Sequence, residues 1–308
     1  MGPWPLPLRR HRVDAVAMTD AISPSATAVP TPLPQFRAVL VPLDGSPTAE
    51  RALSPARWLA ANFGAELHTV TAGVSPGTGW YRRYVAQIGA EAPGIVTHTS
   101  ATAHAAGTIA AVSRDLHPCL VCIGTHGRAR SAALLGSTFV DLARHLGRPL
   151  VAVGRHARLP LRSHHGRIVA CVDGSTRSEL VLPVAAAWAE RLALRLSILH
   201  VSEPHPAALV PDEHRHRPFD PDRYVEDIAR RPYLAALGAT PLVAWGPVGP
   251  DDGLEGALAA EPATLVALAS RLRTGAGRAL HGSDAACMVH LSPAPVLVVP
   301  AGDPDVTT

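Results

Sequence analysis

The sequence predicts an α/β protein made of two tandem domains, each a doubly wound parallel sheet with helices on both faces. Three observations lead to this fold class. A length of 308 residues is typical of two domains. Continuous apolar runs alternate with helical patterns, which is typical of parallel strands buried on both faces. The order of these segments also occurs twice along the chain, which indicates an internal repeat.

Each copy opens with an apolar strand that ends in Asp-Gly-Ser, at Asp44 and at Asp173. A helical pattern follows each motif, over residues 48–63 and 177–192. Asp and Ser favour this junction because their side-chain oxygens accept hydrogen bonds from the backbone N–H groups of a first helical turn. The two motifs therefore indicate equivalent strand-to-helix turns.

The later strands recur in the same order in both copies. They are expected at 67–72, 120–124 and 149–153, and at 196–201, 265–269 and 295–299. The second strand of the second copy begins 129 residues after its counterpart, the same offset that separates the two Asp-Gly-Ser motifs. A helix is expected at 137–146, between the last two strands of the first copy.

These boundaries place the first domain at 36–155 and the second at 166–301, with a linker near 155–166. Residues 1–35 contain seven Pro and show no amphipathic period, so we expect a disordered Pro-rich leader. The apolar last strands, at 149–153 and 295–299, are where we expect the two domains to pair within the chain. A homodimer is a further expectation.

Composition excludes several classes of function. All 28 basic residues are Arg, so a Walker P-loop, a protein kinase and a pyridoxal enzyme are excluded, because each needs a Lys. A net charge of +3 and 4% aromatic residues do not support a nucleic-acid interface. No apolar run approaches the roughly 20 residues that span a bilayer, so no membrane association is expected.

Four Cys in a chain of this length are too few for a disulfide scaffold and favour a cytoplasmic location. Cys119 and Cys122 form a C-x-x-C motif inside an apolar strand, where residues three apart point to opposite faces. We therefore expect two buried structural thiols there and no metal site. The His residues between 200 and 216 lack the spacing of a metal site, and His200 is expected in the core or at its rim.

In a doubly wound sheet, ligands bind beyond the carboxyl ends of the strands. Asp44 and Gly124 each end a strand, and a Gly-containing loop leads from Gly124 to a helix that begins at Ser137. Glycine allows close approach of backbone N–H groups to an anion, and a helix N-terminus adds unpaired donors and partial positive charge. Phosphates are thus expected on this loop, with Arg128 or Arg130 assisting, and ribose or adenine on Asp44.

These residues resemble the universal stress protein family, over residues 36–301 as two tandem domains. The family's ATP-binding members carry an Asp after the first strand and a G-x2-G-x9-G-(S/T) loop, matched here by Asp44, Gly124, Gly127, Gly136 and Ser137. Eight residues separate Gly127 from Gly136, one fewer than in the family pattern, and one residue of chain spans about 3 Å.

The resemblance implies a Rossmann-like fold of the adenine nucleotide α-hydrolase type, with ATP as the ligand and Mg²⁺ only as its counter-ion. It also places the base against Ala72, at the end of the second strand. The residues assigned to this site are Asp44, Gly45, Ser46, Ala72, Gly124, Thr125, His126, Gly127, Arg128, Gly136, Ser137 and Thr138. His126 either contacts a phosphate or is simply solvated.

The second copy departs from the pattern. It keeps Asp173, Gly282 and Ser283, but Ala269 and Leu272 replace the two leading glycines. A Leu where the chain needs close phosphate approach or positive φ would cost about 1–3 kcal/mol or be excluded. We therefore expect a degenerate second site, or one that Gly275 and Gly277 complete in a different way.

Three functions stay open at this point. The first is a nucleotide-binding stress-response regulator that acts by a ligand-dependent conformational change. The second is a tandem scaffold that binds no nucleotide and recruits other proteins. The third and weakest is an enzyme, since the sequence contains no nucleophile elbow and no paired carboxylates beside the glycine loop. Any ATP hydrolysis should be slow without a positioned base or Mg²⁺ ligands.

Overall fold

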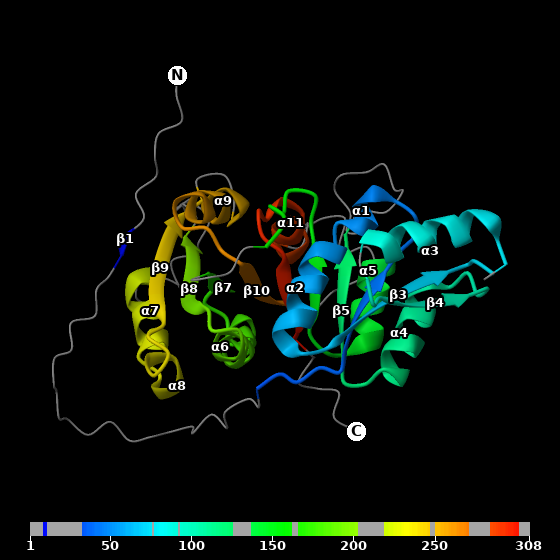
Figure 1. Ribbon diagram of the computed structural model, residues 1–308. Coiled ribbons are helices and arrows are strands. Elements are labelled where there is room, and N and C mark those ends of the chain that lie inside the picture. Colours follow the sequence, from blue (N-terminus) through cyan, green and yellow to red (C-terminus); the bar gives the residue numbers. More distant parts are fainter. Residues whose placement is uncertain are drawn as a thin grey trace, which may run out of the picture.

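Within the described residues, eleven strands form one continuous sheet in the computed structural model. The structure describes residues 9–10, 33–75, 77–91, 93–125, 137–161, 166–202, 219–246, 250–270 and 284–301. The strand order is β1-β9-β8-β7-β10-β11-β6-β5-β2-β3-β4. Figure 1 shows this sheet running from β9 on the left to β4 on the right.

The first half of the chain supplies one end of the sheet and its helices. Its strands are β2 (Ala38–Pro42), β3 (Glu66–Ala72), β4 (Val96–Ser100), β5 (Cys119–Gly124) and β6 (Leu150–Val153). Its helices are α1 (Pro47–Glu50), α2 (Leu53–Phe63), α3 (Gly79–Glu91), α4 (Ala105–Asp115) and α5 (Ser137–Leu146). The helix expected at 137–146 is confirmed.

The second half repeats this arrangement. Its strands are β7 (Arg167–Val172), β8 (Arg195–Ser202), β9 (Thr240–Trp245), β10 (Leu265–Ser270) and β11 (Val296–Pro300). Its helices are the 3₁₀ turn η1 (Ser178–Leu180), α6 (Val181–Arg191), α7 (Pro221–Ala229), α8 (Pro232–Ala235), α9 (Pro250–Ala260) and α11 (Asp284–Leu291). The expected tandem α/β fold is therefore confirmed.

The strands are parallel within each half, and the two halves join through their last strands. Val151 of β6 pairs with Leu297 of β11 in antiparallel register. The order β4-β3-β2-β5-β6 in the first half matches β9-β8-β7-β10-β11 in the second, so the halves are related by an approximate two-fold. The pairing of the apolar last strands within the chain, expected from the sequence, is thus confirmed.

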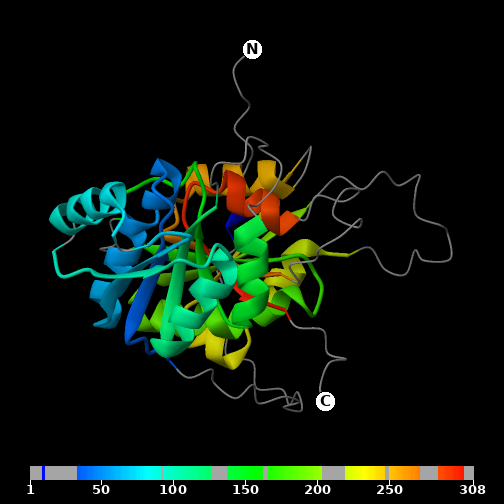
Figure 2. The same cartoon turned by 90° about the vertical axis from the view of Figure 1, so that its right-hand side faces the viewer.

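Two layers of helices cover the sheet, one on each face. Helices α2, α3, α6, α7 and α8 bury side chains in one core, and α4, α5, α9 and α11 in the other. Figure 2 views the sheet from the β4 side, so that the two helical layers lie on either side of it. Successive strand residues alternate between the cores because a strand has a period of two. Cys119 and Cys122 accordingly lie buried in opposite cores, as expected.

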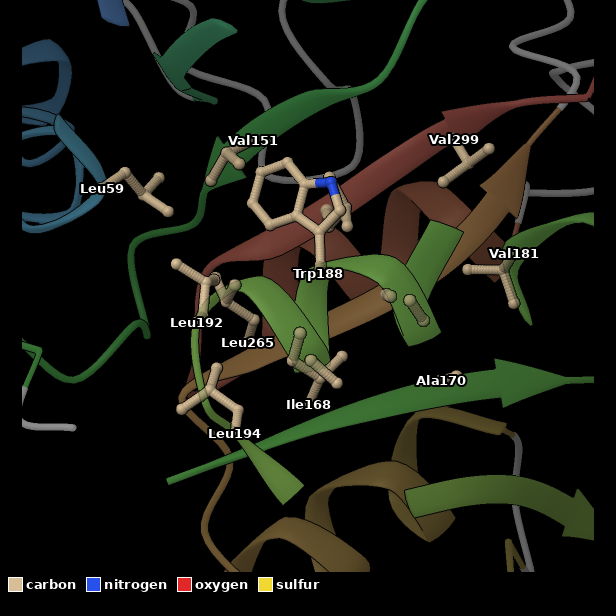
Figure 3. Close-up of a cluster of buried hydrophobic side chains, with 14 of the residues drawn as sticks. Leu59, Val151, Ile168, Ala170, Val181, Trp188, Leu192, Leu194, Leu265 and Val299 are labelled. Atoms are coloured by element: carbon tan, nitrogen blue, oxygen red, sulfur yellow. The ribbon is translucent and has the colours of Figure 1, made fainter. Parts of the chain in front are cut away.

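The core on the α2–α6 face runs without a break from one half into the other. Trp188 of α6 is 2% exposed, and its ring makes edge contacts with Phe63 at 5.3 Å and Phe36 at 6.0 Å between centroids. Figure 3 shows the indole ring pointing from α6 toward Leu59 and Val151 of the first half. Apolar burial therefore joins the halves in addition to the strand pairing.

The first helix of each half is shorter than expected. The pattern over 48–63 predicted one helix, but α1 ends at Glu50 and α2 begins at Leu53. The pattern over 177–192 likewise resolves into η1 followed by α6. Pro55 and Pro183 each lie at the third position of the longer helix. A Pro has no N–H for the carbonyl four residues back and is tolerated only in a first turn, so each helix must restart just before it.

The leader segment contributes one feature to the described structure. Arg9 and Arg10 form β1 and pair antiparallel with Val243 and Leu242 of β9. The expectation of a disordered leader did not include this edge strand, and the residues around it lie outside the described part of the chain. In the described residues, no helix combines the length and the apolar character needed to cross a bilayer.

Candidate functional site

The Asp-Gly-Ser turn of the first half lies at the carboxyl end of β2. Leu43 N–H donates to the Val70 carbonyl at 2.9 Å, which extends the β2–β3 ladder to the start of the turn. Asp44 is exposed, and its Oδ1 accepts a hydrogen bond from Ser46 N–H at 2.9 Å. Gly45 has φ +77°, a conformation that L side chains rarely adopt. The turn therefore presents the Asp44 carboxylate at the rim of the sheet.

Ser46 connects this turn to the helix that follows. Its Oγ accepts from Ala49 N–H at 3.2 Å and caps α1, and Pro47 occupies the first helical position. The predicted cap is thus present. The cap orients the Ser46 hydroxyl toward the helix, while the neighbouring Asp44 carboxylate stays accessible to a ligand.

Two further predicted residues converge on this turn. The β2–β3 pairing ends at Pro42 and Val70, so Asp44 follows β2 at the same edge of the sheet as Ala72, the half-buried last residue of β3. Gly124 ends β5 against the first turn of α1. A Cβ at Gly124 would collide with the Thr48 carbonyl oxygen and lie 3.0 Å from the Ala49 Cα. The structure therefore brings Asp44, Ala72 and Gly124 to one place on the rim.

The glycine at position 124 has a packing role that sequence analysis did not assign. Its missing Cβ allows α1 to approach the end of β5, whatever ligand the site takes. Thr125 is buried, and its hydroxyl lies 3.4 Å from the Val153 carbonyl, next to the backbone bond that links β5 to β6. Its hydroxyl is thus directed into the fold.

The central part of the predicted phosphate loop lies outside the described residues. This applies to His126, Gly127, Arg128 and Gly136 in the first half, and to Leu272, Gly275, Gly277, Gly282 and Ser283 in the second. Ser137 and Thr138 begin α5 as predicted, and the buried Phe139 and Leu142 anchor that helix in the core. The helix N-terminus thus follows directly on the predicted loop.

An aromatic side chain that sequence analysis missed stands over the first turn. Trp80 is 42% exposed, and its Cζ3 would lie 3.7 Å from a Cβ at Gly45. The next residue, Tyr81, is buried, with its hydroxyl near Thr71 of β3 and Thr97 of β4. Burial raises the pKa of Tyr81, and the two Thr side chains partly offset that effect. Tyr81 thereby fixes the start of α3 to the sheet.

The second Asp-Gly-Ser turn has the same backbone. Gly174 has φ +89°, and Asp173 Oδ1 accepts from Ser175 N–H at 2.9 Å and from Ser175 Oγ at 2.6 Å. Asp173 N–H also donates to Ser178 Oγ at 3.1 Å, a bond that the equivalent Ala49 cannot make. Burial alone would raise the pKa of Asp173, but the Ser175 and Ser178 hydrogen bonds outweigh it and lower that pKa. The Asp173 carboxylate therefore accepts more hydrogen bonds from its own turn than the Asp44 carboxylate does.

A cluster of three rings stands beside the second turn, and one of them, Phe219, lies over its glycine. Phe219 lies 3.4 Å from where a Cβ on Gly174 would be, and its ring centroid is 5.2 Å from that of His200 and 5.4 Å from that of Tyr224. Tyr224 Oη donates to Glu179 Oε1 at 3.1 Å, and Arg231 donates to the other Glu179 oxygen at 2.6 Å. This network holds the ring cluster over the turn.

His200 belongs to this cluster, in agreement with the expectation of a core or rim position. It is 7% exposed, and its Nδ1–H donates to the Val172 carbonyl at 3.0 Å. Burial lowers its pKa, although the Val172 bond and the nearby Asp173 partly offset that effect. His200 is therefore neutral near pH 7. Within the described residues, no group of three metal-ligating side chains is placed to hold a metal ion.

The aromatic residues that stand over the two turns carried little sequence signal. Trp80 lies in the first turn of α3 and Phe219 lies just before α7, at different distances from their Asp-Gly-Ser motifs. The constant offset between the two repeats therefore does not align the two rings. Aromatic residues make up only 4% of the chain, and this scarcity was the one sequence signal that could have drawn attention to Trp80 and Phe219. Only the structure shows that both halves use one of these few rings at the same place.

Searches for similar proteins agree with this architecture. Two solved structures described as universal stress proteins match almost the whole described fold. The one from Archaeoglobus fulgidus is 18% identical and covers 87% of this chain and 100% of its own, with a TM-score of 0.55. The one from Pseudomonas aeruginosa, described as putative, is 18% identical and covers 86% of this chain and 93% of its own, with a TM-score of 0.56.

A functionally unknown protein from Pseudomonas aeruginosa is also similar, with 17% identity, coverage of 86% of this chain and 93% of its own, and a TM-score of 0.57. At these identities the likeness establishes the fold alone. No curated protein matches the sequence significantly. The family model described as the universal stress protein family matches twice, over residues 35–154 and 164–300. Two consecutive family domains thus account for most of the sequence, and the chain belongs to the universal stress protein family.

Proposed function

We propose that the first half of this stress-response protein binds ATP, and that binding changes its conformation without turnover. The observation that carries the proposal is the exposed Asp44 carboxylate on a glycine turn, next to Ala72 and Gly124 at the carboxyl edge of the sheet. Ligands of doubly wound sheets bind at this edge. The second half has the same exposed turn, with a cluster of rings beside it.

The charges at this edge favour a nucleotide in one orientation. A carboxylate repels phosphate, so Asp44 suits the ribose hydroxyls or the amine of adenine, which donate hydrogen bonds. The phosphates would then extend toward the loop after Gly124 and the N-terminus of α5 at Ser137. Mg²⁺ would accompany the nucleotide as its counter-ion. Ala72 would border the base.

Slow or absent turnover follows from the chemistry of phosphoryl transfer. The reaction needs a positioned nucleophile, metal-binding carboxylates or an arginine that stabilises the transition state. The sequence has no paired carboxylates beside the predicted glycine loop, and Oδ1 of Asp44 already accepts from Ser46 N–H. We therefore infer that occupancy, and not hydrolysis, is the signal.

Calorimetric titration with ATP tests the proposal, with Asp44→Ala and Asp173→Ala as a matched pair. Both aspartates lie on equivalent exposed turns, so the two variants lose the same group from the same kind of structure. We expect Asp44→Ala to weaken ATP binding at least tenfold and Asp173→Ala to leave it unchanged. Equal affinity of wild type and Asp44→Ala would refute the site.

Hydrogen exchange of the same protein tests the conformational part. We expect ATP to slow exchange of backbone amides across residues 124–137 and to leave the second half unchanged. Phosphate release, measured in parallel, should stay close to the uncatalysed rate. Rapid release that Asp44→Ala abolishes would instead establish an enzyme.

A scaffold without nucleotide is the second candidate, and the ring cluster beside the turn of the second half favours it. Phe219 lies over Gly174 and packs on His200 and Tyr224, at the edge where a ligand of that half would approach. Native mass spectrometry of freshly purified protein separates the two candidates. A bound mass equal to that of ATP supports the first, and its absence after addition of excess ATP supports the scaffold.

A further inference from the structure

Both halves place one exposed aromatic ring directly over the glycine of the Asp-Gly-Ser turn. Trp80 is 42% exposed and Phe219 is 56% exposed, although large apolar side chains are mostly buried in this fold. A Cβ on Gly45 would lie 3.7 Å from Trp80, and a Cβ on Gly174 would lie 3.4 Å from Phe219. An aromatic ring therefore occupies the equivalent position over the turn in both halves.

The two rings differ in what they contact. Phe219 packs on His200 and Tyr224, and the Tyr224–Glu179–Arg231 hydrogen bonds hold that cluster in place. Trp80 contacts Tyr81 edge-on at 5.9 Å and Tyr84 at 6.3 Å between centroids, both on its own helix. Both rings thus pack on two other rings of their own half and both stay exposed. The Phe219 cluster is tied to Glu179 and Arg231, whereas Trp80 packs on its own helix and lies over the turn that carries Asp44.

The position of Trp80 is fixed by its neighbour. Tyr81 is 6% exposed, and its hydroxyl lies near Thr71, next to the last residue of β3, and Thr97, the second residue of β4. This anchor holds the first turn of α3 at the rim of the sheet, one residue away from the indole. A ring held in this way loses little conformational freedom when a flat ligand stacks on it, which favours binding.

We propose that Trp80 is the stacking wall for the base of the nucleotide that the first half binds, and that it sets the preference of the site for a planar aromatic ring. This inference rests on the proposed function and adds a residue and a selectivity to it. Asp44 would accept hydrogen bonds from the nucleoside while the indole covers one face of its base. Stacking of a base on an aromatic side chain is sequence-tolerant, since every base has a π-face.

Calorimetry with three ligands and three proteins tests the assignment. ATP, adenosine and inorganic triphosphate are each titrated into wild type, Trp80→Ala and Trp80→Phe. Stacking on an aromatic ring is typically worth about tenfold or more in affinity. We expect Trp80→Ala to weaken ATP and adenosine about tenfold and to leave triphosphate unchanged. Trp80→Phe keeps a ring and should stay within about twofold of wild type.

Phe219→Ala is the matched control, because it removes the equivalent ring from the second half. We expect its ATP affinity to equal that of the wild type. If the wild type binds ATP and Trp80→Ala binds it equally well, the stacking role of Trp80 is overturned and the proposed site stays in place. Absence of any ATP binding by the wild type would overturn the site and the stacking role together, and weakening by Phe219→Ala alone would move the ligand to the second half.

Circular dichroism and thermal unfolding accompany the titrations. Trp80 is largely exposed, so Trp80→Ala should fold with an unchanged spectrum. Tryptophan fluorescence gives an independent readout: adenosine should quench the emission of the wild type and not that of Trp80→Phe. Equal quenching in the two proteins would contradict stacking on Trp80.

Discussion

The two Asp-Gly-Ser turns share a backbone and differ in their surroundings. Gly45 and Gly174 both adopt positive φ, and Asp44 and Asp173 both accept from the N–H of the Ser two residues on. Both turns are exposed. In the second half the Ser178 hydroxyl accepts from the Asp173 N–H, and a ring cluster that includes Phe219 stands beside the turn. A repeated sequence motif therefore fixes local geometry, while the segments packed around it set which side chains a ligand would meet.

The same contrast exists at the ends of the neighbouring strands. Gly124 ends β5, where a side chain would collide with the backbone of α1, and Ala269 occupies the corresponding place in β10. The first half thus has a strand–helix approach too close for a Cβ, at a place where the second half carries one. Duplication of a fold leaves such positions free to diverge, because each half packs its own helices.

The largest expected effect concerns the core that joins the two halves. Trp188→Ala removes a ring that packs on Phe63 and Phe36, and we expect a loss of about 3–5 kcal/mol in the free energy of unfolding. Because this core is continuous, unfolding in urea should stay a single transition. Two transitions, only one of them shifted, would show that the halves unfold independently. Trp80→Ala is the control and should lose less than about 1 kcal/mol.

A smaller effect tests the strand ends. Gly124→Ala forces a Cβ against the Thr48 carbonyl, so we expect a loss of about 1–3 kcal/mol from overpacking. Ala269→Gly in the second half relieves no such contact and should lose only about 1 kcal/mol, through the added freedom of the unfolded chain. Urea denaturation measures both. If Gly124→Ala is as stable as wild type, the close contact between β5 and α1 is absent in solution.

The smallest effect is a pH dependence that both halves share. Burial lowers the pKa of His98, with the neighbouring His68 adding to the effect, and burial likewise lowers the pKa of His200. A His with a lowered folded pKa stays neutral in the fold while the unfolded chain takes up a proton near pH 6.5. Stability should therefore be full above about pH 6.5 and fall as the pH decreases toward the folded pKa values.

Thermal unfolding between pH 7.5 and 5.5 measures this dependence. His98→Asn in the first half and His200→Asn in the second should each flatten the fall in melting temperature. The effect of His98→Asn should stay below about 1 kcal/mol, since His98 is only half-buried. A pH profile identical to that of the wild type in both variants would contradict the role of these side chains.

Much of the fold could be predicted from sequence because its signals are local. Continuous apolar runs identified parallel strands, and the repeated motif identified two domains. Helix α5 was predicted with its bounds, and the opposite faces of Cys119 and Cys122 followed from the period of a strand. The breaks before α2 and α6 were missed, although Pro55 and Pro183 carried the signal, because the helical pattern continues across them.

The candidate site could be predicted only in part. The strand-end rule placed Asp44 and Gly124 on one rim, and the structure brings them together with Ala72. Trp80 and Phe219 could not be found, because each reaches its turn from a segment whose distance along the chain differs between the halves. The predicted positions from His126 to Gly136 lie outside the described residues, so their role stays a prediction.

The amino-acid sequence by itself determined the α/β class, the two repeats, the capped turns and the absence of lysine chemistry, because these depend on residue type and spacing along the chain. The tertiary structure decided that the halves join edge to edge through β6 and β11, that their core is continuous, and that a different ring stands over each turn. These features depend on contacts between residues far apart in the chain, and such contacts are set by packing rather than by local preference.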